Sequence, residues 1–283
     1  MPSNVGTYTG FRFWSRDLLE ERDMFEDLGR VDTFRVLVSG GGDGAQQDFQ
    51  RALTGLFGRQ LYDLLAEYLP APDLLNAVLA EDSARRSFAW RRDGTYLATA
   101  LGDWHGAFLK VVDDIWAAWA KDDSTLDAIV AKVLTRPTVH ATWIVGGATP
   151  DFGYALNRFL TLLLARLHAH ATKRDFISDL KGVAAAGPGN EVIVLGHWMQ
   201  RVHVPDETRD RDTGGPHVCG DARKCFGIAH EVFVADQMKA PAGYPQHSMG
   251  EFHALVVRHG VDQRPLFFRS PASEQIVPFS LPA

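Results

Sequence analysis

Histidine and cysteine are concentrated in the last third of this chain of 283 residues. Seven of the eleven histidines and both cysteines lie between residues 197 and 259. These residues are His197, His203, His217, Cys219, Cys225, His230, His247, His253 and His259. Their side chains bind metals, transfer protons or act as nucleophiles near neutral pH. The sequence therefore predicts chemistry, if there is any, in this region.

One subset of these residues could hold a metal ion. His217 and Cys219 are separated by one residue, so in an extended segment both side chains would point to the same side. Cys225 and His230 add two further ligands, although the chain has no closely spaced cysteine pair. Zinc prefers nitrogen and sulfur ligands in a tetrahedral arrangement. The subset predicts a transition-metal site, with zinc as the candidate cofactor.

A second subset could form a nucleophilic relay. A cysteine nucleophile needs a nearby base and a third polar group that orients the base. Cys219 could be the nucleophile, His253 on a following strand the base, and Asp262 the orienting acid. This order along the chain resembles the order in papain-like and transglutaminase-like enzymes. It predicts a hydrolase or transferase.

The third interpretation of the same residues is structural. Histidines at strand ends satisfy backbone groups, and free cysteines are often small buried hydrophobic residues. The sequence leaves all three interpretations open.

A glycine-rich segment near the start of the chain offers a different kind of site. It follows the predicted strand Phe34–Ser39 and precedes a predicted helix, where backbone N–H groups can approach a phosphate. Gly40, Gly42 and Ala45 match the loose form of the dinucleotide fingerprint. The acidic residue expected about 20 positions later would be Asp63, which lies inside the predicted helix. The alternative is a tight turn. The glycines are Gly40, Gly41, Gly42 and Gly44.

Three predicted strands end in glycine, and two of them lead into helices. The strands are Phe34–Ser39, His140–Val145 and Glu191–Leu195. Helices are expected over 46–69 and 152–170, after the first two strands. A strand followed by a helix is typical of α/β units.

The remaining elements complete a mixed fold, which we expect to be α/β or α+β. The region 1–188 is predicted to be helix-rich, and 189–283 strand-rich with an extended tail, both packed as one globular unit. Further helices are expected over 104–120, 124–134 and 172–184, and further strands over 200–204, 231–235, 252–257 and 266–269.

Composition limits the classes of function. The net charge of −6 argues against general binding to nucleic acid or to an anionic membrane surface. No apolar stretch approaches the roughly 20 residues that span a bilayer, and the first residues contain no signal-peptide core. Two cysteines fit a reducing compartment. We expect a soluble protein of the cytoplasm or another reducing intracellular compartment.

Three functions therefore stand as hypotheses. The first is a hydrolase or transferase whose site lies in the last third of the chain. The second is a self-assembling coat, shell or scaffold protein, because aromatic helices and a proline-containing tail suit contacts within a homo-oligomer. The third is a nucleotide-binding α/β domain that uses the glycine-rich segment.

Overall fold

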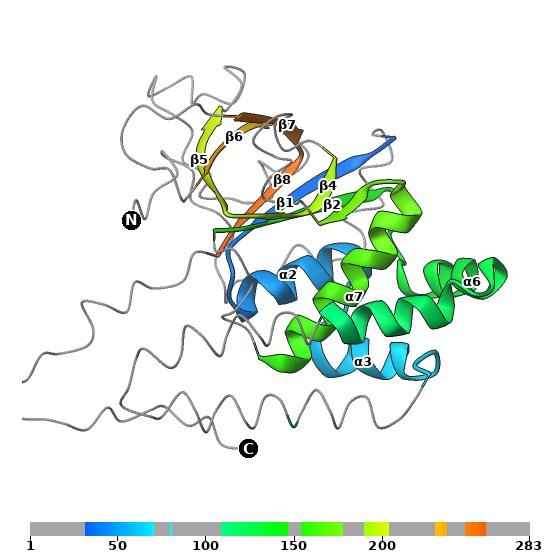
Figure 1. Cartoon of the computed structure of the whole chain (residues 1–283). Helices are drawn as coiled ribbons and strands as arrows, with labels where there is room; N and C mark the ends of the chain where they lie inside the picture. Colours follow the sequence, from blue (N-terminus) through cyan, green and yellow to red (C-terminus); the bar gives the residue numbers. More distant parts are fainter. Residues whose placement is uncertain are drawn as a thin grey trace, which may run out of the picture.

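The computed structural model of the chain describes residues 32–70, 80, 109–146, 154–177, 190–203, 230–236 and 247–258. Its central layer is a parallel sheet made of β1 (Phe34–Ser39), β2 (Val139–Val145), β3 (Asp175–Ile177), β4 (Glu191–Leu195) and β8 (Ala254–Val257). The strands follow the order β3-β4-β2-β1-β8. In Figure 1, helices cover the lower face of this sheet and a smaller sheet lies above it. The fold is therefore α/β in three layers.

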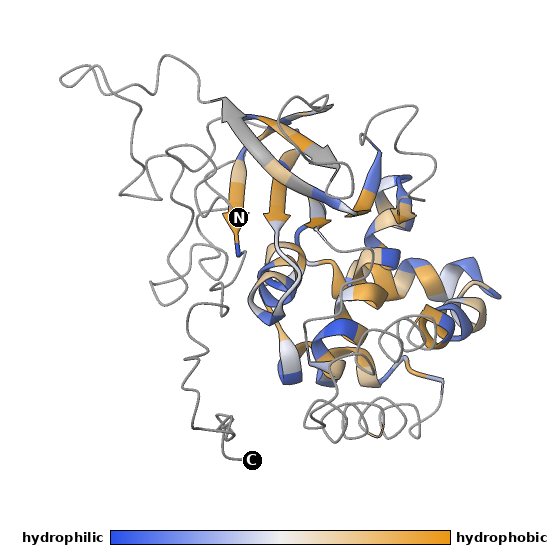
Figure 2. Cartoon of the chain, turned by 60° about the vertical axis from the view of Figure 1, so that its left-hand side comes forward, coloured by the Kyte–Doolittle hydropathy of each residue, from blue (hydrophilic) through white to orange (hydrophobic). Residues whose placement is uncertain are grey.

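The central strands are apolar on both faces because both faces are covered. Side chains alternate along a strand. Val36 and Val38 therefore belong to the core between the central sheet and the helices, whereas Leu37 belongs to the core between the two sheets. Figure 2 shows hydrophobic residues running along these strands. This pattern explains why the sequence has continuous apolar runs here.

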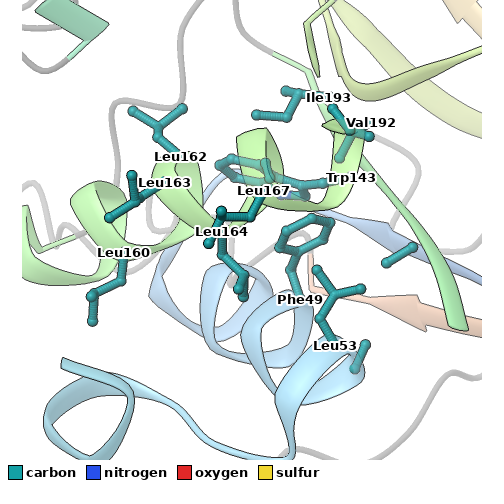
Figure 3. Close-up of a cluster of buried hydrophobic side chains, with 14 of the residues drawn as sticks. Phe49, Leu53, Trp143, Leu160, Leu162, Leu163, Leu164, Leu167, Val192 and Ile193 are labelled. Atoms are coloured by element: carbon teal, nitrogen blue, oxygen red, sulfur yellow. The ribbon is translucent and has the colours of Figure 1, made fainter. Parts of the chain in front are cut away.

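Helices α2 (Asp43–Thr54) and α7 (Ala155–Thr172) pack directly on the sheet. Figure 3 shows Phe49 of α2 and Leu167 of α7 beside Trp143 of β2. All three side chains are 0% exposed. Burying each one contributes about 1.5–3 kcal/mol or more. Helices α3 (Gly58–Ala66) and α6 (Asp123–Val133), with helical residues 109–119, complete this layer.

The small sheet contains β5 (His197–His203), β6 (His230–Asp236) and β7 (His247–Phe252) in antiparallel order. Met199, Val232 and Phe252 are among the residues that pack it against the central sheet. Strand β4 runs into β5 through Gly196, and β7 runs into β8 through His253. The two sheets are thus joined by the chain at both places.

Arg174 joins the middle of β2 to the amino end of β4. Its guanidinium donates hydrogen bonds to Ala141 O (2.9 Å), to Thr142 Oγ1 (2.7 Å) and to Glu191 O. Burial lowers the pKa of Arg174 to about 10, so the side chain stays cationic at neutral pH. These bonds fix β2 and β4 side by side.

Most strands were predicted at their observed positions. The predictions for β1 and β4 have the observed bounds, and β2 begins one residue earlier than expected. The predicted strand 252–257 is wrong as one element, because it is divided at His253. The predicted strand 266–269 lies outside the described residues.

Several predicted helix boundaries are wrong. The helix expected over 46–69 is two helices, since Gly55 has a left-handed backbone (φ 72°) and ends α2. The helix expected from Ser124 begins at Asp123, because Asp122 caps it and its Oδ1 accepts from Ser124 N (3.1 Å). The helix expected over 172–184 is wrong for the described residues up to 177. Lys173 ends α7 with φ 56°, and β3 follows.

The central sheet does not follow the predicted division into a helix-rich and a strand-rich region. Strands β1, β2 and β3 come from 1–188, whereas β4 and β8 come from 189–283. Both regions therefore contribute to one sheet. No helix in the described part of the chain is long and apolar enough to cross a membrane.

A buried histidine gives the fold a pH dependence. Burial, then the charges of Arg174 and His140, lower the pKa of His168 from 6.5 to about 3. His168 Nε2 accepts a hydrogen bond from Ala141 N (3.1 Å). Between pH 6.5 and 3 the unfolded chain binds a proton that the folded chain excludes. The free energy of unfolding therefore does not depend on His168 protonation above pH 6.5, and it falls as the pH decreases from 6.5 towards 3.

We predict that His168→Gln, which keeps an acceptor but does not titrate, flattens the fall in unfolding free energy over this range. The difference in slope should approach about 1.4 kcal/mol per pH unit, the value for one proton. Urea unfolding at pH 4, 5, 6 and 7 measures it. His170→Gln, at a more exposed position on the same helix, is the control. Equal slopes for wild type and His168→Gln would contradict the prediction.

Candidate functional site

The carboxyl ends of three neighbouring parallel strands lie side by side, and a glycine follows each. Ser39 of β1 is in register with Ile144 of β2, and Val145 is in register with Leu195 of β4. Neighbouring strands are about 4.8 Å apart, so the row from β1 to β4 spans about 10 Å. The three glycines are Gly40, Gly146 and Gly196. The sequence showed three strands ending in glycine, and the structure brings these ends together.

The chain leaves this edge of the sheet in two directions. After β1 and β2 it continues to α2 and α7 on the helical face. After β4 it continues to β5, which packs on the opposite face. In open parallel sheets, ligands bind beyond the carboxyl ends of the strands where connections diverge in this way. This divergence lies between β2 and β4, and β1 is the neighbour of β2, so the candidate site is the edge formed by these three strands.

Gly40 is required by the fold. Its φ is 143°, and a Cβ at this position would lie 2.2 Å from Arg258 O at the end of β8. Gly40 O accepts a hydrogen bond from Trp143 Nε1 (2.7 Å). Gly42 differs, because its φ is −89° and a Cβ there would meet no atom of the described residues within 4 Å. The fold explains the first glycine but gives no steric reason for Gly42.

The amino end of α2 opens onto this edge. Its N-cap residue, Gly42, provides no side-chain cap, so the first backbone N–H groups of the helix favour an anion or another acceptor. Asp43 lies in the first turn, and its Oδ1 accepts from Tyr154 N (2.7 Å) and Asn157 Nδ2 (2.8 Å). This carboxylate ties the glycine-rich segment to the start of α7. It also places a negative charge beside the helix end.

A buried ion pair fixes α2 relative to β8. The carboxylate of Asp48 is 0% exposed and lies 2.6 Å from Arg258 Nε and 3.0 Å from Arg51 Nη1. Removing one partner of a buried pair costs about 3–5 kcal/mol because a buried charge is left behind. Asp48 is thus a structural support for the site.

His197 lies at this edge directly after Gly196 and is only 5% exposed. Its Nδ1 is 2.8 Å from Leu195 O. A carbonyl oxygen can only accept, so Nδ1 donates; in the neutral ring the lone pair is then on Nε2. In this form the ring can accept a hydrogen bond or a proton at Nε2. The sequence placed His197 in the histidine-rich region without assigning it a role; a histidine just after a glycine-ended strand was the available signal.

The structure separates four of the described histidines, His197, His203, His230 and His253, into two groups. His197 begins β5 at the carboxyl edge, whereas His203 ends β5. His203 is in register with Glu231, next to His230, and His230 is in register with Phe252, next to His253. His253 N donates to Arg35 O near the start of β1 (2.8 Å). The second group therefore lies at the amino end of the parallel strands.

His253 is held by the backbone of β1. Its Nδ1 accepts a hydrogen bond from Arg35 N (2.9 Å), and its ring stacks on Phe34 at 5.3 Å between centroids. Because Nδ1 is the acceptor, the neutral ring carries its proton on Nε2. In this form Nε2 donates, and to act as a base His253 would have to release the hydrogen bond from Arg35 N.

The other members of the two predicted sets lie outside the described residues. They are His217, Cys219, Cys225 and Asp262. His230 is described as the first residue of β6. Across the described residues no group of three histidines, cysteines or carboxylates could hold a metal ion. The relay of Cys219, His253 and Asp262 and the metal set of His217, Cys219, Cys225 and His230 stay predictions.

Asp63 lies within α3 and pairs with Arg59 at 2.7 Å on an exposed surface. The acidic residue of the dinucleotide fingerprint belongs at the end of a second strand. Asp63 does not occupy such a position.

The chain matches no protein-family model, no curated protein and no solved structure. Its function must therefore be inferred from the geometry of its own residues.

We predict that Gly40→Ala destabilises the fold by more than about 2 kcal/mol, because the new methyl group would contact Arg258 O and the backbone conformation disfavours L side chains. Gly42→Ala is the matched control. It should change the unfolding free energy by less than about 1 kcal/mol, since the space is open. Urea unfolding measures both. Equal losses of stability in the two variants would show that the close contact of Gly40 with Arg258 O does not cause the destabilisation.

Proposed function

We propose that this chain binds a nucleotide at the carboxyl edge of its parallel sheet. The glycine-rich segment Gly40, Gly41, Gly42 and Gly44 would lie against the ligand at one end, and His197 at the other. The observation that carries this proposal is the row of three glycine-ended strands beside the uncapped start of α2. The row spans about 10 Å, which suits a ligand of nucleotide size.

Glycine at position 42 supports the proposal. The described residues leave open space where a Cβ would lie, so their packing does not require glycine at this position. Glycines in strand-to-helix turns allow ligands to approach the backbone closely. A nucleotide in contact with the start of α2 would use this space.

His197 gives the proposed site a group for chemistry. When the ring is neutral, its lone pair is on Nε2, because Nδ1 donates to Leu195 O. A buried imidazole in this form can act as a general base towards a hydroxyl or a water molecule. We therefore propose an enzyme that transfers or hydrolyses a group on the bound nucleotide, with His197 as the proton acceptor.

The direct test is thermal unfolding of the full chain with ATP, GTP, NAD and ADP-ribose, each at millimolar concentration. A nucleotide at 100 times its Kd stabilises the folded state by about 2.7 kcal/mol, which for a protein of this size raises Tm by several degrees. Gly42→Leu should abolish this rise because its side chain fills the space for the ligand. The absence of any rise in wild type would overturn the proposal.

Two variants make the result interpretable. Gly42→Ala should bind more tightly than Gly42→Leu, and the unliganded Tm of both should stay close to that of wild type. His197→Gln should keep nucleotide binding within a few-fold but lose any turnover detected by chromatography of the products. Full turnover in His197→Gln would remove its proposed role and leave the binding proposal intact.

A second candidate function is the hydrolase or transferase that uses the histidines and cysteines after residue 200. Its support is that the segment 204–229, with Cys219 and Cys225, begins after His203 and ends before His230. Both of these residues lie at the end of the small sheet that carries His253. The segment thus starts and ends near His253.

We predict for this candidate that Cys219→Ala abolishes either bound zinc or thiol-dependent activity. Metal content by mass spectrometry separates the two, since the metal set includes Cys225 and the relay does not. Under the metal hypothesis Cys225→Ala also loses zinc, whereas under the relay hypothesis it retains activity. A protein without metal, whose Cys219 reacts with iodoacetamide no faster than Cys225, would contradict both.

A further inference from the structure

Gln46 presents an unsatisfied buried oxygen beside the glycine-rich segment. The side chain is 0% exposed, and its Nε2 donates a hydrogen bond to Gly41 O (3.3 Å). Because a carbonyl oxygen can only accept, this bond fixes which end of the amide faces Gly41. Oε1 then has no hydrogen-bond donor among the described residues.

A buried acceptor without a partner destabilises the folded state, and native proteins contain few of them. Side chains of an α-helix point towards its amino end, so Gln46 reaches back from the second turn of α2 towards Gly42. Gln46 N also donates to Gly42 O (3.1 Å), so both the backbone and the amide of Gln46 contact the glycine-rich segment. A ligand bound against this segment could supply the missing donor.

The neighbouring carboxylate indicates which donor it is. Asp43 and Gln46 are three residues apart on α2 and share one face of the helix. The negative charge of Asp43 disfavours a phosphate next to Gln46, whereas a neutral hydroxyl suits two adjacent acceptors. Carboxylates bind ribose hydroxyls in this way at the carboxyl edges of other parallel sheets.

We infer that Gln46 Oε1 accepts a hydrogen bond from a ribose hydroxyl of the bound nucleotide, and that Gln46 thereby selects ribonucleotides over deoxynucleotides. This inference rests on the proposed nucleotide site. It places the sugar against the start of α2, and it makes Gln46 a specificity-determining residue.

Isothermal titration of the full chain tests this inference. The probes are the nucleotide among ATP, GTP, NAD and ADP-ribose that raises Tm most, and its 2′-deoxy and 3′-deoxy forms. Wild type should bind one deoxy form about 10-fold more weakly than the ribonucleotide, as expected for the loss of one hydrogen bond in a buried site. Gln46→Met, which keeps the length of the side chain, should bind all forms with equal, weaker affinity.

Gln47→Met is the matched control, because the residue is adjacent and less buried. It should keep the wild-type preference for the ribonucleotide. Gln46→Met should unfold at a Tm equal to or above that of wild type, since it removes an unsatisfied acceptor.

Three outcomes would overturn the inference. If wild type binds ribonucleotide and deoxynucleotides equally, the hydroxyl is not recognised. If Gln46→Met keeps the preference, another residue provides it, and the proposed function still stands. If no nucleotide binds wild type, the proposed function fails and the inference fails with it.

Discussion

The central parallel sheet is buried on both faces, and this constraint decides where polar chemistry can lie. Helices cover one face and the small antiparallel sheet covers the other, so most side chains in the middle of the strands are apolar, and a polar one such as Thr142 is hydrogen-bonded. Reactive groups can then come only from the ends of the strands and from the segments that follow them. The candidate site at the carboxyl edge is a consequence of this arrangement.

The segments at that edge are positioned by polar contacts between α2 and α7. Gln50 Nε2 donates to Thr161 Oγ1 (2.8 Å) in the buried interface, and Asn157 donates to Asp43 closer to the edge. The ion pair of Asp48 with Arg258 extends the same support to β8. Buried polar contacts of this kind fix one arrangement of two helices more specifically than apolar packing does. These contacts of α2 with α7 and β8 therefore fix the position of the glycine-rich segment.

Local patterns in the sequence predicted the central strands well, because a strand buried on both faces is a short apolar run followed by a turn residue. The observed bounds of β1 and β4 match the expected ones. Helix ends were predicted less well, since Gly55 and Lys173 adopt left-handed conformations that apolar periodicity does not reveal. The sequence showed that three strands end in glycine, but it did not show that these strands are neighbours in the sheet. Strand order depends on contacts between residues far apart in the chain, and no local pattern encodes it.

The histidines illustrate the same limit at the level of function. Closeness in sequence suggested one cluster, but β5 is seven residues long and carries His197 and His203 about 20 Å apart, at its two ends. His197 therefore belongs with Gly40 and Gly146, which are distant in sequence, and His253 belongs with Arg35. Strand β5 runs from the carboxyl edge of the parallel sheet back to its amino edge. Histidines that are close in sequence therefore lie at opposite edges. Topology, and not spacing along the chain, thus decides which residues can act together.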